Sequence, residues 1–254
     1  MTVFSLALES GNTGLWYGRF IELPGTHARS QDRQSLLEVL REELLYHDSW
    51  LRKHGEQSRI REAFSMNVAE EIHDVVNLGE SGGEVATFEF DRRTVTTRML
   101  DHFIRLMGHN RQDLLGLVSD LTPQQMSNIP EGKKRDITGI LQHVCNAEEF
   151  YLSRLGAETD QKYEKYEGTS ESEVDKLPVF QRLEVVRRAC VMCLRDVVPK
   201  KGATMFTRAE YTNNPSEQWT AYKVMRRYLE HEREHYYNIR EYLGLPAREG
   251  IKSS

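Results

Sequence analysis

Residues 228–236 of the chain read YLEHEREHY, which places His231 and His235 four positions apart in a strongly helical segment. Side chains at positions i and i+4 project from one face of a helix. Two imidazoles in that relation can reach a single metal ion at ~2.0–2.1 Å. An apolar and aromatic stripe through Tyr228 includes the same positions, so we expect both histidines on the inward face of a helix over 216–243.

A third histidine, His143, lies on an inward stripe of a helix predicted over 136–155. The next turn of this stripe carries Ala147, whose small side chain leaves room for a cluster of ligands. If the helix packs antiparallel to the last one, three imidazoles converge on one ion that keeps open coordination positions. Such a site is typical of a catalytic or substrate-binding metal. For the i,i+4 pair alone, solvated or hydrogen-bonded histidines are the alternative.

The string from His231 to His235 also fits H-E-x-x-H, the zinc-peptidase motif. The extended form of the motif fails, because Asn238 stands at its glycine and Glu241 at its third histidine. Only 19 residues follow His235 in the 254-residue chain, which leaves little room for a separate helix with a glutamate ligand. We therefore reject a peptidase and predict His143, His231 and His235 as the ligands of one metal ion.

Helical periodicity runs through the whole region from residue 92 onward. Asp91 is the expected cap of a first helix of about 28 residues, and Pro123 follows its end. The segments predicted after it are a helix over 136–155, a polar loop over 158–176, a helix over 179–198, a loop over 200–215 and the helix over 216–243. Four long amphipathic helices predict an all-α four-helix bundle over 92–254.

The first ninety residues follow a period of two around a single helix. The predicted elements are strands over 4–8 and 15–21, a helix over 36–51 entered through Ser30, and strands within 66–76 and over 84–90. This ββαββ order predicts a small α/β domain over 1–90. The net charge changes from −8 over 1–91 to +3 over 92–254, which also favours a boundary there. The whole chain is then a multi-domain α+β protein with two separate cores.

The segment ITGILQHVCNAEEFYL at 137–152, together with HEREH at 231–235, resembles the DinB-like superfamily. The resemblance covers about 92–245 and rests on the order, spacing and helix placement of the histidines. It implies an up-down-down-up four-helix bundle whose divalent metal is bound by His143, His231 and His235. It also implies an activity among transferases and isomerases that use bacterial low-molecular-weight thiols, although many relatives have no known activity.

Residues 1–90 resemble, through fewer features, the HicB-like antitoxin fold. The matching features are a strand pair that leads into Leu23-Pro24-Gly25, a helix entered through Ser30-Gln31-Asp32, and the segment from Leu51 to Glu56. HicB antitoxins often continue into a DNA-binding motif, whereas here a metal-binding type of bundle follows. The resemblance therefore implies a fold rather than a function.

Composition excludes several classes of protein. A net charge of −5 argues against a nucleic-acid binder, because phosphate contacts need clustered Lys and Arg. No apolar run approaches the ~20 residues that span a membrane, and the N-terminus does not read as a signal peptide. The three cysteines cannot all pair in one chain, and the C-x-x-C of Cys190 and Cys193 reads as core thiols. We expect a cytoplasmic protein.

Some charged residues allow two interpretations. Glu148 orients an inward histidine or arginine, or is a surface charge. The cluster Lys133-Lys134-Arg135 is either a solvated segment that precedes the helix, or a basic entrance to the metal site that suits an anionic thiol. His102 and His109 read as surface or hydrogen-bonded residues rather than as groups close to the metal.

The sequence thus predicts a divalent-metal-dependent enzyme of the DinB-like type, with a thiol-dependent transfer as its reaction. The ion is expected to be Zn or Ni, with Fe or Mn as alternatives, and three nitrogen ligands also suit Cu. The expected partners are a small-molecule substrate or thiol and, by the family resemblance, a second copy in a homodimer. The alternative is a non-enzymatic stress or regulatory protein that acts through protein–protein contacts and whose metal is structural or vestigial.

Overall fold

A computed structural model describes residues 2–58, 60 and 63–248 of the chain. Its contacts divide these residues into two compact units. The sheet unit consists of the described residues up to Arg92, together with Thr207–Gln218 and Arg248. The helical unit consists of Arg93–Phe206 and Trp219–Ala247. A small mixed sheet followed by a helical region confirms the predicted α+β class, and the sheet unit also takes in a segment that the sequence had placed among the helices.

The sheet unit contains a four-stranded mixed sheet in the order β3-β2-β1-β4. Its elements are β1 (Thr2–Gly11), β2 (Trp16–Phe20), β3 (His27–Ser30), helix α1 (Arg33–Lys53) and β4 (Phe64–Val75). The first three strands pair antiparallel, and β4 pairs parallel to β1. A parallel partner needs a long crossover connection, and α1 provides it.

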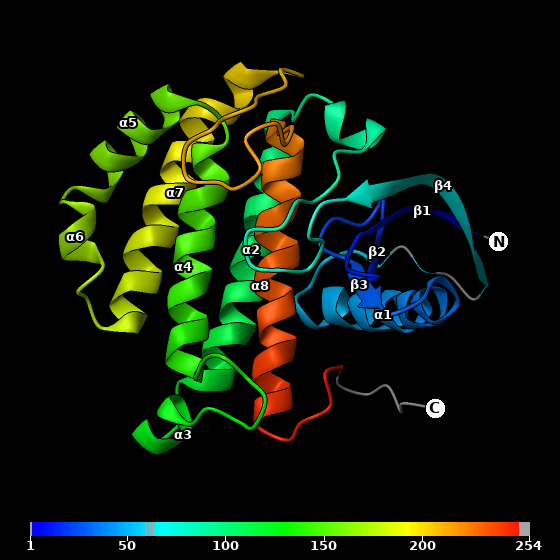
Figure 1. Cartoon of the computed structure of the whole chain (residues 1–254), viewed down its shortest axis with the longest axis horizontal. Helices are drawn as coiled ribbons and strands as arrows, with labels where there is room; N and C mark the ends of the chain where they lie inside the picture. The colour runs from blue at the N-terminus through cyan, green and yellow to red at the C-terminus, as the bar shows by residue number, and fades with distance from the viewer. Residues whose placement is uncertain (1, 59, 61–62, 249–254) are drawn as a thin grey trace. The chain divides into compact units, whose positions relative to one another are not determined.

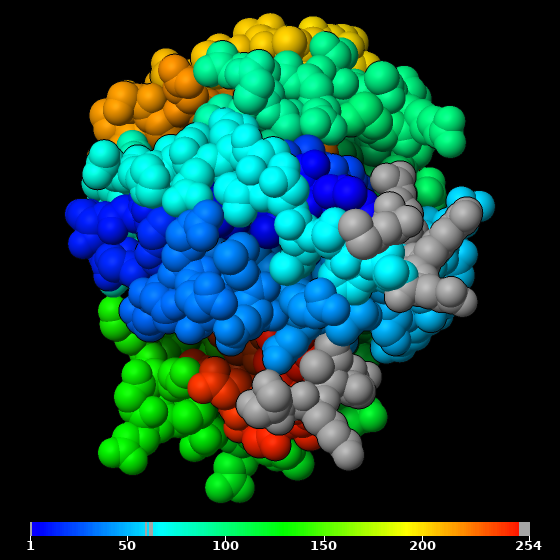
Figure 2. Space-filling view, turned by 90° about the vertical axis from the view of Figure 1, so that its right-hand side faces the viewer, coloured from blue at the N-terminus to red at the C-terminus, as the bar shows by residue number. Residues whose placement is uncertain are grey.

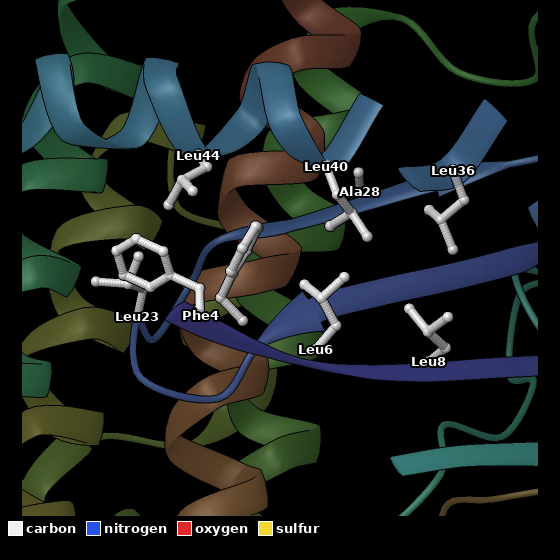
Figure 3. Packing of buried hydrophobic residues seen from close by; sticks show 9 residues of the cluster. Phe4, Leu6, Leu8, Leu23, Ala28, Leu36, Leu40 and Leu44 are labelled. Carbon is white, nitrogen blue, oxygen red and sulfur yellow. The ribbon is translucent and has the colours of Figure 1, made fainter. Parts of the chain in front are cut away.

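The core of the sheet unit lies between α1 and one face of the sheet. Figure 3 shows leucines of α1, Leu36, Leu40 and Leu44, facing Leu6 and Leu8 of β1. The packing is so close at Gly18 that a Cβ atom there would lie 2.6 Å from a methyl group of Leu40. The opposite face of α1 is on the surface and is drawn in blue in Figure 2. This helix therefore contributes to the core of the sheet unit.

Two predicted features of this unit are wrong. Residues 84–90 form no strand: the backbone amides of Val85, Ala86 and Phe88 are bonded to the carboxylates of Glu217, Glu9 and Asp91. A short 3₁₀ helix, η1 (Glu89–Arg92), ends the segment. The missing strand is β3, so the order is βββαβ rather than ββαββ.

The helix caps differ from the prediction for a local reason. Ser30 is the last residue of β3 and pairs with Trp16, so it cannot cap α1. Asp32 caps the helix instead, by accepting a hydrogen bond from the amide of Ser35 at 2.9 Å. Asp91 is likewise used within the sheet unit, where it binds the amide of Phe88. The cap of the next helix is therefore Thr96, five residues later than predicted.

Four long helices lie side by side in the helical unit (Figure 1). They are α2 (Thr97–Val118), α4 (Ile137–Ser153), α7 (Val179–Lys201) and α8 (Ala221–Tyr242), and a short α3 (Pro123–Ser127) precedes α4. Helix α4 packs against both α7 and α8, and α2 packs against α8. Figure 1 shows α4 and α8 running in opposite directions. Over the described residues, no helix combines the length and apolar character that a bilayer crossing requires.

The predicted loop over 158–176 is also wrong, because it contains α5 (Ala157–Glu167) and α6 (Glu171–Val174). The face of α5 that packs inward carries Thr159, Tyr163 and Glu167 at spacings of four. Thr159 and Glu167 are buried, and the Thr159 carbonyl accepts a hydrogen bond from Cys193 of α7. This stripe is polar, so the apolar period that marks an amphipathic helix is missing.

One tyrosine links α5 to α4. The Tyr163 hydroxyl lies 2.9 Å from Glu149 of α4 and 3.0 Å from Glu167. A phenol has one proton and can donate it to only one carboxylate, so a second hydrogen bond requires that the other carboxylate be protonated. Burial raises the pKa of Glu149 to about 7, and it also raises the pKa of Glu167. The junction therefore retains a proton near neutral pH.

Glu149→Gln is predicted to change how stability depends on pH. The pKa of Glu149 rises on folding from its usual 4.5 to about 7, so the folded state binds the proton more tightly. Ionisation of the Glu149 carboxyl group therefore lowers the free energy of unfolding as the pH rises from about 4.5 to about 7. We expect the variant to gain up to about 3 kcal/mol relative to wild type between pH 5 and pH 8. Urea unfolding at the two pH values measures this gain.

The matched control is Glu164→Gln on the exposed side of α5, which should follow the wild-type curve. Identical pH dependence in wild type and Glu149→Gln would contradict the assignment of a retained proton to this junction.

Candidate metal centre

The three predicted ligands come from α4 and α8. Asp136 begins α4, because its carboxylate accepts a hydrogen bond from the amide of Gly139 at 2.6 Å. Two turns of helix then bring His143 to the side that faces α8. Thr220 caps α8 in the same way through the amide of Lys223. The helix begins after Trp219 rather than at residue 216, because Trp219 pairs with Phe206 in an isolated β-bridge.

The three imidazoles converge on one point. The Nε2 atoms of His143 and His231 are 3.2 Å apart, and those of His231 and His235 are 3.1 Å apart. Two nitrogens bound tetrahedrally to one zinc ion at ~2.0–2.1 Å would be ~3.3 Å apart. Within the described part of the chain, this is the one group of three or more His, Cys, Asp or Glu side chains that could hold a metal ion. The donor set therefore fits a divalent cation.

The surroundings keep the imidazoles able to bind a metal. Burial and the nearby charge of Arg135 lower the pKa of His143, so its ring is neutral at pH 7 and offers a lone pair. His231 is buried, while His143 and His235 are half-buried. The side-chain amide of Asn238 lies 3.4 Å from Nδ1 of His235, where it can help to orient that ring.

A buried ion network lies beside the histidines and takes one residue from each long helix. Arg111 of α2 donates to Glu232 of α8 at 2.6 Å and to Glu148 of α4 at 2.5 Å. Arg187 of α7 donates to the same two carboxylates, at 2.9 Å and 2.6 Å. All four side chains are at most 12% exposed. The two positive and two negative charges balance within the core.

This network decides the roles of both glutamates. Glu148 therefore orients arginines within the core, and the alternative interpretation of a surface charge is wrong. Glu232 is the glutamate of the H-E-x-x-H string, and Arg111 and Arg187 lower its pKa. It is directed away from the histidines, one position along the helix from His231, and cannot serve as the base of a zinc peptidase.

The arginines of this network were not among the site residues predicted from the sequence. Arg111 lies on the inward stripe of α2 with Met107 and Leu114, and all three are buried. A charged residue at such a position must be paired, because burial of an unpaired charge is very costly. The place of Arg111 in an apolar helical stripe is therefore the sequence feature that indicates a buried ion pair.

The remaining candidates lie outside the cluster. Cys145, Cys190 and Cys193 are buried and free, and burial raises the pKa of each thiol, for Cys145 and Cys193 to about 12. The C-x-x-C is therefore a pair of core thiols, as predicted. His102 is half-buried beside Arg105, with 3.1 Å between their nitrogens. Lys133, Lys134 and Arg135 are exposed, and Lys133 pairs with Glu241 at 3.1 Å.

Comparison with known proteins concerns the helical unit. Residues 107–239 match the sequence model described as the DinB superfamily. These residues extend from within α2 to the last turn of α8 and contain all three histidines. No curated protein and no solved structure matches the chain. The resemblance of residues 1–90 to the HicB-like fold stays a prediction.

Glu232→Gln is predicted to destabilise the protein by about 3 kcal/mol, because it leaves the two buried guanidinium groups with only one carboxylate charge. Glu241→Gln on the same helix is the matched control. Its pair with Lys133 is exposed, so we expect a change below about 1 kcal/mol. Thermal unfolding measures both variants. Equal stabilities of the two variants would show that the network does not hold the helices together.

Proposed function

This chain belongs to the DinB superfamily, and from its histidine cluster we propose that it is an enzyme that depends on one divalent metal ion. The observation that carries the proposal is the convergence of three Nε2 atoms from His143, His231 and His235. Three protein nitrogens suit a catalytic ion, because structural zinc sites use four protein ligands. The ion would then keep a position for water or substrate.

When bound, the ion would act as a Lewis acid that lowers the pKa of a water or thiol. The chain's own residues would hold it in place. His143 supplies a neutral imidazole from one helix, and His231 and His235 supply two from the other. Asn238 would help to fix the orientation of His235. Zn or Ni is the ion that we propose first, with Fe or Mn as alternatives.

The reaction that we propose is the transfer of an external thiol. The three cysteines of the chain are poor nucleophiles, because burial keeps them in the thiol form at neutral pH. A thiol bound at the metal must therefore arrive as a substrate. The exposed cations Lys133, Lys134 and Arg135 precede α4, and the charge of Arg135 is already felt at His143. They would favour the approach of an anionic thiol.

Two expectations accompany this proposal. The homodimer implied by the family resemblance stays a prediction, and light scattering at working concentration tests it. A non-enzymatic role through protein contacts is the alternative function. It would leave the metal without turnover and would be the conclusion if a metal-loaded protein transfers no thiol.

His231→Ala is predicted to abolish metal binding and to leave α8 intact, because alanine favours helix more than histidine does. After loading with Zn²⁺ and exhaustive dialysis, we expect one ion per wild-type chain and less than a tenth of that in the variant. Elemental analysis measures metal content, and circular dichroism measures helix content. His102→Ala in α2 is the matched control and should keep the metal.

Metal retained by the His231→Ala protein would refute the site. Turnover is then tested with small thiols and 1-chloro-2,4-dinitrobenzene. In this reaction the thiol sulfur forms a thioether bond to the aromatic ring and chloride leaves. The proposal predicts product with loaded wild type and none above background with His231→Ala. Equal rates for both proteins would remove the proposed reaction.

A further inference from the structure

The contact between α4 and α8 extends beyond the three histidines. Because the two helices are antiparallel, positions 143, 147 and 151 of α4 lie level with 235, 231 and 227 of α8. The first two levels contain His143 with His235, and Ala147 with His231. The third contains Tyr151 and Arg227, whose side chains are in contact. This pair therefore lies one helical turn from the metal cluster.

Arg227 uses only part of its donor capacity. Its Nη1 donates to Glu230 at 2.9 Å, and its Nη2 donates to the hydroxyl oxygen of Tyr151 at 3.1 Å. Its Nε is buried and has no hydrogen-bond partner among the described residues. The side chain as a whole is 7% exposed. A guanidinium N–H in such a place is rarely left without an acceptor.

Tyr151 has a spare donor as well. Its hydroxyl oxygen accepts from Arg227, so its own proton points elsewhere, and the described residues provide no acceptor for that proton. The residue is 7% exposed, and burial raises the pKa of the phenol, which therefore stays protonated. Leaving a buried donor without a partner is energetically costly. Two such donors beside each other indicate an acceptor that binds between them.

The two donors face the same small region. Nε and Nη2 donate from one edge of the planar guanidinium, so an acceptor bound at Nε of Arg227 lies next to the Tyr151 hydroxyl. The Tyr151 ring is 5.7 Å from the ring of His231. The charge of Glu234 acts on Tyr151, Arg227 and His143 alike. The unpaired donors and the histidine cluster are therefore neighbours within the helical unit.

We propose that Arg227 and Tyr151 bind a carboxylate group of the substrate whose reacting group lies at the metal. Two adjacent donors can each bind one of the two oxygens of a carboxylate. A phosphate dianion fits less well, because it needs more donors and would meet the negative charges of Glu230 and Glu234. The inference rests on the proposed function for the role of the metal, while the carboxylate site itself requires only the two donors.

The experiment uses two thiols of similar size on the full chain loaded with Co²⁺. Mercaptoacetate carries a carboxylate, and 2-mercaptoethanol carries a hydroxyl group in its place. Sulfur-to-cobalt absorption reports binding of either thiol. We expect wild type to bind mercaptoacetate at least ten times more tightly than mercaptoethanol, as a hydrogen bond to a charged group allows.

Tyr151→Phe removes one donor and keeps the ring, and Arg227→Lys keeps the charge and removes the guanidinium edge. Each variant should lose most of the tenfold preference while its affinity for mercaptoethanol stays within twofold. Tyr166→Phe on α5 is the matched control and should keep the preference. A wild type without preference, or a preference that survives in both variants, overturns the proposal and assigns the donors to bound water.

A second arm separates this inference from the metal. The metal-free chain is titrated with acetate, with fluorescence as the readout, because the ring of Trp219 is 5.8 Å from that of Tyr151. Saturable quenching in wild type that is absent in Tyr151→Phe supports the carboxylate site even if Co²⁺ is not retained. Failure to retain Co²⁺ would then count against the proposed function alone. No saturable response in wild type overturns the inference.

Discussion

Two arginines and two glutamates, one from each long helix, form the ion network on which the helical unit depends. Burial of four charges is tolerated only because each carboxylate accepts from both guanidinium groups. A helix that slipped by one residue would rotate its side chains by about 100° and leave charges unpaired. The pairing of Glu148 with Glu232 through the arginines therefore fixes the register of α4 against α8. That register is what brings His143 level with His235.

Helix α8 accordingly serves three purposes with three sets of residues. His231 and His235 face the proposed metal, Glu232 faces the ion network, and Arg227 faces Tyr151. The H-E-x-x-H letters occur here without peptidase geometry, because the glutamate stabilises the core and the two histidines meet a third histidine from α4. The same string of residues can therefore support different chemistry, and the partners of the middle glutamate distinguish the cases.

The sequence allowed the histidine cluster to be predicted because helical spacing and the Asp136 cap set the heights of the three residues. Long-range contacts could not be read in that way. Residues 84–90 alternate like a strand, yet their amides bind the carboxylates of Glu9, Glu217 and Asp91. Helix α5 was missed because its inward face is polar. The arginines of the network were missed because their partners lie on other helices, although their place in an apolar stripe was visible.

We propose that the register of α4 and α8 places three imidazoles around one metal ion. X-ray absorption at the metal edge of the zinc-loaded full chain measures this coordination. With His143, His231 and His235 as the proposed protein ligands, we expect a coordination shell with three imidazole nitrogens at about 2.0–2.1 Å and one further light atom. A shell of oxygens alone, or one with fewer than three imidazoles, would contradict it.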